Sequence, residues 1–210
     1  MNQMRRAARR VGVSVLTLVA LLAITLSLFL FPPVTHLFLG LARSADVLNV
    51  EPAVAHALSD ALVRDLLIGG AFEVPLNAEP LLSASERSHL VDVGILFRIL
   101  MATGAISCAT LVGVYLRNRR WFVQGLRDGA ILLGVGAAVV GAAFTFAFDA
   151  TFTFAHELLF PAGNWTFNPA TDRLVQLYPT TFWVWTASSF CAVLVGAATL
   201  GFLFARTRRH

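Results

Sequence analysis

The sequence predicts an all-α membrane protein with four transmembrane helices, two extracytoplasmic segments and both termini in the cytoplasm. Of its 210 residues, 57% are hydrophobic and only 13% are charged, whereas a soluble domain carries about a quarter charged residues. A soluble core cannot absorb this much apolar surface, so the surplus must face lipid. Four apolar runs also reach the length of about 20 residues that a bilayer crossing requires.

The first apolar run, residues 11–31, follows a cluster of four arginines. It is too long for the apolar part of a cleaved signal peptide, which spans roughly 7–15 residues. The sequence Phe31-Pro32-Pro33 also lacks the small residues of a cleavage site. We therefore interpret this run as the first transmembrane helix, which enters the membrane from the cytoplasm.

The first outer segment, residues 32–92, contains a predicted amphipathic helix from Glu51 to Ile68. Apolar residues recur at every fourth position from Val54. A proline suits the first turn of this helix, and Gly69-Gly70 suit its end. We expect this helix to lie on the outer membrane surface or to cap the bundle, and the stretch after it to form a loop with a short extended piece.

Ser83 and Glu86 have the spacing of a capping box, in which each side chain binds the other residue's backbone N–H. The helix that starts there continues as the second transmembrane helix, residues 93–116. The following stretch, 117–129, carries four arginines and is the predicted cytoplasmic loop.

The third transmembrane helix is predicted at residues 130–148. Ala130, Gly134, Ala138 and Ala142 place a small side chain at every fourth position. Such a stripe allows two membrane helices to approach closely.

The second outer segment is predicted at residues 149–181, and the fourth helix at 182–204. Eleven of the sixteen arginines flank the sides assigned to the cytoplasm, while eleven of the twelve acidic residues lie in the outer segments. The positive-inside rule therefore places both termini of this chain, which we expect to form a single multi-pass domain, in the cytoplasm. Because the arginines flank apolar runs and form no patch among aromatic residues, we expect no nucleic-acid partner.

Cys108 and Cys191 lie inside apolar runs and have no metal-binding spacing. We expect them to pack in the bundle, and we predict neither a metal site nor a cofactor.

Two histidines, His89 and His156, are the leading candidates for chemistry. If their helices continue straight, they lie some 22–25 Å from the membrane midplane, just outside the hydrocarbon core of about 30 Å. They would occupy one level on neighbouring helices, close to the depth of lipid ester groups. Asp92 is three residues after His89 and could orient its imidazole. The alternative is that each histidine is an ordinary interfacial residue and the two never meet.

Arg98 lies within the second predicted span, where an ionisable residue is a functional candidate by default. Its alternative role is structural, either reaching the outer interface or pairing with a carboxylate. In the second outer segment, Trp165 and its aromatic neighbours could simply form an interfacial belt.

Two motifs resemble a family of bacterial four-span membrane proteins that includes the lipoprotein intramolecular transacylase. One is Glu86-x-x-His89-x-x-Asp92-Val93, which leads into the second helix. The other runs from His156 to Phe160 and continues through Asn164-Trp165, Asp172 and Pro179-x-x-Phe182.

The resemblance implies an acyltransferase whose active face is extracytoplasmic and whose partners are membrane lipid and a diacylated lipoprotein. The sn-2 acyl chain would move from the diacylglyceryl group to the amine of the N-terminal cysteine. His89 and His156 would share the acid and base roles without a cofactor. Asp92, Arg98, Asn164, Trp165 and Asp172 would position groups or support the oxyanion.

Two other functions remain open from the sequence. A non-catalytic accessory or lipid-binding protein of an envelope complex would use the small-residue stripe and the outer helix as partner surfaces. A metal-dependent hydrolase would need a third strong ligand beside the two histidines.

Overall fold

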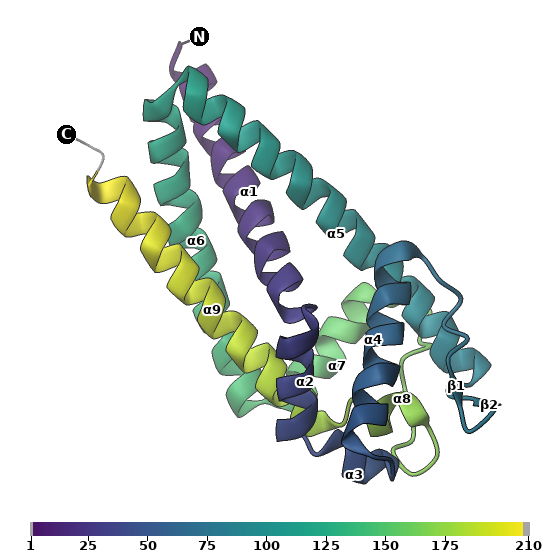
Figure 1. Ribbon diagram of the computed structural model, residues 1–210. Helices are drawn as coiled ribbons and strands as arrows, with labels where there is room; N and C mark the ends of the chain where they lie inside the picture. The colour runs from purple at the N-terminus through teal and green to yellow at the C-terminus, as the bar shows by residue number, and fades with distance from the viewer. Residues whose placement is uncertain (1, 208–210) are drawn as a thin grey trace. The chain divides into compact units, whose positions relative to one another are not determined.

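The computed structural model describes residues 2–207 and consists mainly of helices, which Figure 1 traces from purple to yellow. Four helices are long and apolar enough to cross a membrane, and they coincide with the four predicted spans. These are α1 (Asn2–Phe29), α5 (Ala84–Arg117), α6 (Arg119–Phe146) and α9 (Thr180–Thr207). Arg208 and Arg209, which contributed to the predicted cytoplasmic end, lie outside the described residues.

The chain divides into two compact units, each built from separate stretches of sequence. The first comprises Met1–Ser27, Leu100–Ala142 and Ser189–His210, and the second comprises Leu28–Ile99 and Ala143–Ser188. The organisation as one domain therefore stays a prediction.

The core of the first unit is the seam between α6 and α9. Its buried side chains are small or aliphatic, and leucines of α1 pack against them. The five fully packed members are Ala130, Leu133, Ala137, Leu194 and Ala198.

Glycines of α6 allow α1 to approach its backbone. A side chain at Gly129 would meet the Ser14 carbonyl oxygen at 2.8 Å, and one at Gly125 would collide with Val13. The Ser14 hydroxyl donates a hydrogen bond to the Gly125 carbonyl at 3.1 Å. The close contact between these helices thus depends on the missing Cβ atoms.

Strict four-residue spacing describes each packed face only in part. On α6, Ala130 is buried as predicted, but Ala138 and Ala142 are exposed. Leu133 and Ala137 complete the packed side of α6. On the outer amphipathic helix, the leucines of the predicted pattern are buried, and only its first member, Val54, is exposed. Each step of four residues advances about 40° beyond a full turn, because a helix has 3.6 residues per turn. A stripe of period four therefore leaves the packed face within a few turns.

The second unit contains the outer segments together with part of α5 and the beginning of α9. Within it, the short helix Ser44–Leu48 (α3) packs against both Pro52–Ile68 (α4) and Arg173–Leu177 (α8). The further elements of this unit are α2 (Pro32–Leu41), β1 (Pro75–Leu76), β2 (Glu79–Pro80) and α7 (Phe148–Leu159).

Helix α4 and the segment after it match the sequence-based expectation. α4 starts at Pro52 and ends where Gly69 adopts a left-handed φ of 80°. The following short extended pieces, β1 and β2, form an antiparallel hairpin. Asn77 and Ala78 connect them with φ of 53° and 68°, as in a two-residue hairpin turn of type I′.

The third predicted span does not continue straight toward His156. α6 ends at Phe146, and α7 begins at Phe148. Ala147, between them, has φ −143° and ψ 51°, outside the helical region. The aromatic and aliphatic pattern runs unchanged through this point and contains no proline or glycine, so the sequence offered no signal for the break. Residues 149–159, which we assigned to the second outer segment, are therefore part of a separate helix.

Candidate active site

His89 lies near the start of α5, where the predicted capping box is confirmed. The Ser83 N–H donates to Glu86 Oε2 at 2.7 Å, and the Glu86 N–H donates to Ser83 Oγ at 3.3 Å. These bonds define where α5 begins and thereby place His89 in its early turns. The His89 side chain is buried, with the whole residue only 6% exposed.

His156 lies on α7 and stacks on Phe152, one helical turn earlier, with ring centroids 3.8 Å apart. Its Nδ1 lies 2.9 Å from the Phe152 carbonyl oxygen. Because a carbonyl can only accept a hydrogen bond, Nδ1 must carry the proton. In the neutral ring, Nε2 then keeps its lone pair and can accept a proton from another molecule.

The second unit brings the two histidines together. Their ring centroids lie 5.9 Å apart with an interplanar angle of 33°. Phe160 touches both rings, at 4.8 Å from His89 and 5.6 Å from His156. Trp165 lies 5.2 Å from His156, and Phe167 lies 5.7 Å from His89. Aromatic side chains from the loop after α7 thus surround the imidazole pair.

Asp92 lies near the histidine pair. We had expected it to orient the His89 ring directly, but its hydrogen-bond partner is Asn164. Its Oδ2 accepts a hydrogen bond of 2.8 Å from the Asn164 amide nitrogen, which also reaches Ser88 Oγ at 3.4 Å. Asp92 still acts on His89 through its charge, and Asn164 lies beside the same ring. The Asp92 carboxylate therefore orients the side-chain amide of Asn164, which lies beside the His89 ring.

The His89 ring and the Asn164 side chain interact with each other, but not with ordinary hydrogen-bond geometry. Among the described residues, neither His89 Nδ1 nor Asn164 Oδ1 has a hydrogen-bond partner of ordinary geometry. Because Asn164 presents its amide nitrogen to Asp92, its remaining polar atom is the oxygen, which only accepts hydrogen bonds. Asn164 is therefore poorly suited to stabilise an oxyanion.

Burial lowers the pKa of His156 below its ordinary value of 6.5, and the hydrogen bond to Phe152 offsets part of this shift. Desolvation disfavours the charged imidazolium. His156 is consequently neutral at pH 7, the form that can act as a base.

Arg98 lies away from the histidine pair. Nine residues at about 100° each place it on the face of α5 opposite His89. Its Nη1 donates a 2.9 Å hydrogen bond to the Leu66 carbonyl near the end of α4, and its guanidinium lies over Gly69. A cation at a helix C-terminus is favourable, so this geometry supports the structural role.

Asp172 likewise lies outside the histidine site and forms its hydrogen bonds within its own loop. Its carboxylate accepts hydrogen bonds from the Asn168 N–H at 2.7 Å and the Thr171 hydroxyl at 3.2 Å. It thereby closes the turn that precedes α8, and none of its hydrogen bonds reaches the histidine pair.

Glu86 has a contact that sequence reasoning missed. Besides capping α5, it accepts a 2.7 Å hydrogen bond through Oε1 from the Leu174 N–H of α8. The residue is only 1% exposed. The capping-box motif explained this glutamate completely, so the sequence carried no sign of a partner 88 positions away.

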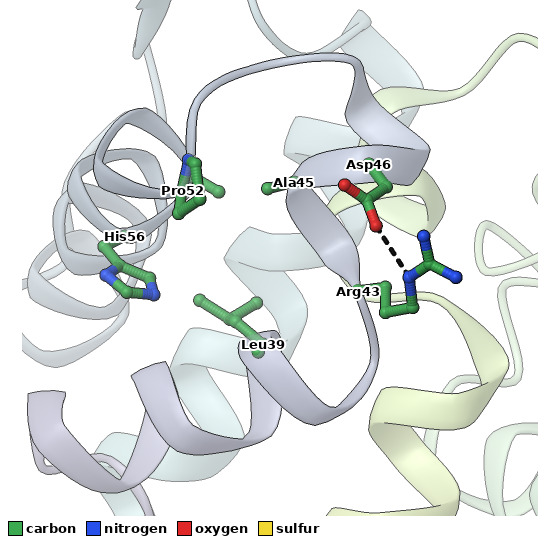
Figure 2. A pocket seen from close by; sticks show the side chains of 8 residues that line it. Leu39, Arg43, Ala45, Asp46, Pro52 and His56 are labelled. Atoms are coloured by element: carbon green, nitrogen blue, oxygen red, sulfur yellow. Dashed lines mark hydrogen bonds and ion pairs between the residues drawn. The ribbon is translucent and has the colours of Figure 1, made fainter.

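A cavity of about 170 Å³ lies elsewhere in the same unit, between α2, α3 and α4. Figure 2 shows Leu39, Pro52 and His56 around it, with the Arg43–Asp46 ion pair to one side. Neither candidate catalytic histidine lines this cavity.

Two observations concern metal ions and thiols. Within residues 2–207, no three His, Cys, Asp or Glu side chains gather in a way that could hold a metal ion. Cys108 and Cys191 are free thiols, and Cys191 is buried against Gly141 in the first unit.

Comparisons with known proteins converge on one family. The family model for lipoprotein intramolecular transacylase Lit matches residues 11–183. The structure resembles the membrane-integral lipoprotein intramolecular transacylase Lit from Bacillus cereus, with a TM-score of 0.80 and 20% identity over 99% of this chain and 96% of that one.

Two variants of the Bacillus cereus protein also match, each at 18% identity and a TM-score of 0.75. A histidine-to-arginine variant covers 98% of this chain and 92% of its own. A histidine-to-alanine variant covers 98% and 94%. At this identity these structures show a shared fold. No curated protein sequence matches the chain.

Proposed function

Since this chain belongs to the lipoprotein intramolecular transacylase family and is a membrane acyltransferase, we propose that His156 and His89 carry out its acyl transfer. The observation that carries this proposal is the pair of imidazoles 5.9 Å apart, one of them with a defined tautomer. The proposed substrate is a diacylated lipoprotein whose N-terminal cysteine bears a diacylglyceryl group. The reaction takes place at the extracytoplasmic face of the membrane.

His156 is the base in this proposal. The α-amine has a pKa of about 7.7–8.0 and is mostly protonated at pH 7. The unprotonated fraction of this amine attacks the carbonyl carbon of the sn-2 ester, and the carbonyl oxygen becomes an oxyanion. The Nε2 lone pair of neutral His156 accepts the proton that the attacking nitrogen loses.

Collapse of the tetrahedral intermediate completes the transfer. The bond between the carbonyl carbon and the glyceryl sn-2 oxygen breaks, and that oxygen takes a proton from an N–H of neutral His89, whose ring lies against the same aromatic wall as His156. His89 receives in exchange the proton held by the His156 imidazolium, so both rings end neutral. The products are an amide at the cysteine and a free hydroxyl at sn-2, with the reacting groups held in one molecule throughout.

Trp165 is the best placed of the predicted residues to support the oxyanion. Its indole nitrogen is a hydrogen-bond donor only, and its ring lies 5.2 Å from His156. Asn164 directs its amide nitrogen to Asp92. Arg98 lies on the opposite face of α5, with its Nη1 bonded to the Leu66 carbonyl. Asp92 positions Asn164 beside His89.

Mass spectrometry of lipoprotein N-termini tests the proposal. The chain is expressed in a bacterium that makes only diacylated lipoproteins, and one acyl chain should move to the cysteine amine. His156→Gln and His89→Gln should each lower conversion by about 10²–10⁴-fold. His56→Gln is the matched control, because His56 lies on the cavity wall of Figure 2, and it should leave conversion unchanged.

Two results would count against this assignment. Conversion that survives both histidine substitutions would place the chemistry elsewhere. No conversion by inserted, folded wild-type protein would reject the lipoprotein substrate. The family membership favours the enzyme over a non-catalytic accessory protein.

A further inference from the structure

We propose that Glu86 is a positioning residue of the acyl-transfer site, which couples α5 to the loop carrying Asn164 and Trp165. This inference rests on the proposed function of the histidine pair. It concerns a side chain that touches neither imidazole in the contacts described above, and it assigns to the glutamate a role beyond helix capping.

The first argument is the geometry of the Glu86 carboxylate. Its two oxygens accept 2.7 Å hydrogen bonds from backbone N–H groups in different segments, Ser83 before α5 and Leu174 in α8. Burying a carboxylate is costly unless both oxygens are paired, and short charge-assisted bonds of this kind are among the stronger ones in proteins. The buried bridge therefore holds the two segments at a defined separation.

The second argument is what the bridged loop contains. Residues 160–172 run from the end of α7 to the start of α8 and carry the side chains that surround the histidines. At its beginning the loop is tied to α7, where the Phe160 N–H donates to the His156 carbonyl at 2.8 Å. Past its other end, the Glu86–Leu174 bond ties the chain to α5.

The third argument is the spacing on α5. Glu86, His89 and Asp92 follow one another at intervals of three residues, so each lies about 60° around the helix from the previous one. The bridge, the histidine and the carboxylate that holds Asn164 thus share one side of α5. Loss of the bridge would leave the Asp92–Asn164 contact to hold the loop against α5, and an ångström of misplacement is enough to slow a reaction that depends on orientation.

Glu86→Gln tests the inference with the full-length protein in lipid nanodiscs and a synthetic diacylated lipopeptide. Glutamine keeps the size of the side chain but has one acceptor oxygen, and its NH2 group would face an N–H donor. We expect kcat to fall at least tenfold with KM little changed, because the loop positions reacting groups. Glu86→Asp keeps the charge on a shorter side chain, and its kcat should lie between those of Glu86→Gln and the wild type. This variant replaces Glu86→Gln as the test if Glu86→Gln does not fold.

Ser83→Ala is the matched control. It removes the hydroxyl that accepts the Glu86 N–H and weakens the helix cap, but it leaves the backbone N–H and the carboxylate bridge in place. Both variants should lower the thermal midpoint, and only the Glu86 variants should lower kcat. Equal kcat for folded Glu86→Gln and the wild type would overturn the inference.

A double-mutant cycle gives a readout that a purely structural role would not move. If Glu86 acts through the loop, the loss of kcat in the double variant Glu86→Gln/Asn164→Ala should be much smaller than the product of the losses in the two single variants. Fully multiplicative losses would overturn the proposal. An inactive wild type in the same assay would instead reject the proposed function, so the two failures are distinguishable.

Discussion

The interiors of the two compact units are stabilised by different kinds of contact. In the first, α6 meets its neighbours through small side chains such as Ala130 and Ala137 and through the bare backbone of Gly129. In the second, polar groups such as Glu86 and His89 are buried, and the His89 ring lies against that of Phe160. Helices surrounded by lipid associate through close packing, whereas catalysis requires polar groups at fixed positions. Substitutions should therefore affect mainly stability in the first unit and mainly activity in the second.

Apart from the two histidines, the largest effect in this comparison is expected at Asp92. Asp92→Ala leaves the Asn164 amide nitrogen without its carboxylate, and a charge-assisted hydrogen bond is worth about 1.5–3 kcal/mol. We expect kcat/KM for a diacylated lipopeptide to fall about 10–100-fold, with Asp92→Asn retaining more activity. Wild-type rates in Asp92→Ala would show that this contact has no part in the reaction.

In the first unit, two glycines of the same helix should respond in opposite directions. Gly129→Ala forces a methyl group against the Ser14 backbone and should destabilise the fold by about 1–3 kcal/mol. Gly136→Ala meets nothing within 4 Å and should stabilise the helix by about 0.5–1 kcal/mol. Thermal unfolding in detergent measures both, and the folded fraction of each variant should keep the wild-type kcat. A lower kcat in folded Gly129→Ala would weaken the division between the units.

The pH dependence should report the burial of His156. Its pKa lies below 6.5, so the base stays neutral as the pH falls to 6.5 and loses its function only at lower pH. Above that range, kcat/KM should fall with decreasing pH only as the substrate amine becomes protonated, below about pH 8. A second decline should set in below pH 6.5 and be absent from the residual activity of His156→Gln. A second decline that begins above pH 6.5 and is absent from His156→Gln would contradict the burial effect.

The same burial makes the fold less stable in acid. The unfolded chain binds a proton at this histidine as the pH drops below about 6.5, whereas folded His156 does so only at lower pH. The stability contributed by neutral His156 is thus present above pH 6.5 and lost as the pH falls through the lowered pKa. Thermal midpoints measured across this range should fall less in His156→Gln.

The smallest effect is expected in the hairpin of the second unit. Ala78 adopts a φ of 68°, a conformation that costs an ordinary L residue about 1–2 kcal/mol. Ala78→Gly relieves this strain but makes the unfolded chain more flexible, so a net gain of about 0.5–1 kcal/mol is expected in thermal unfolding. Activity should not change, since neither hairpin strand carries a site residue.

Local signals in the sequence were sufficient for the spans, the outer helix ending at Gly69 and the cap at Ser83. Each depends on neighbouring residues along the chain: the length of an apolar run, a glycine that tolerates positive φ, or a side chain three positions from its partner. The family resemblance also singled out His89 and His156, whose meeting in space the sequence alone left undecided.

Contacts between distant segments were decided only by the tertiary structure. The break at Ala147 sets the direction of α7, and the sequence pattern runs through it without interruption. Asp92 binds Asn164, 72 positions away, although the nearby His89 was the expected partner. Glu86 joins α8 by a bond to a backbone N–H, a group that every residue except proline possesses. The chain itself therefore determined which chemical groups were available, and packing in three dimensions determined which of them meet.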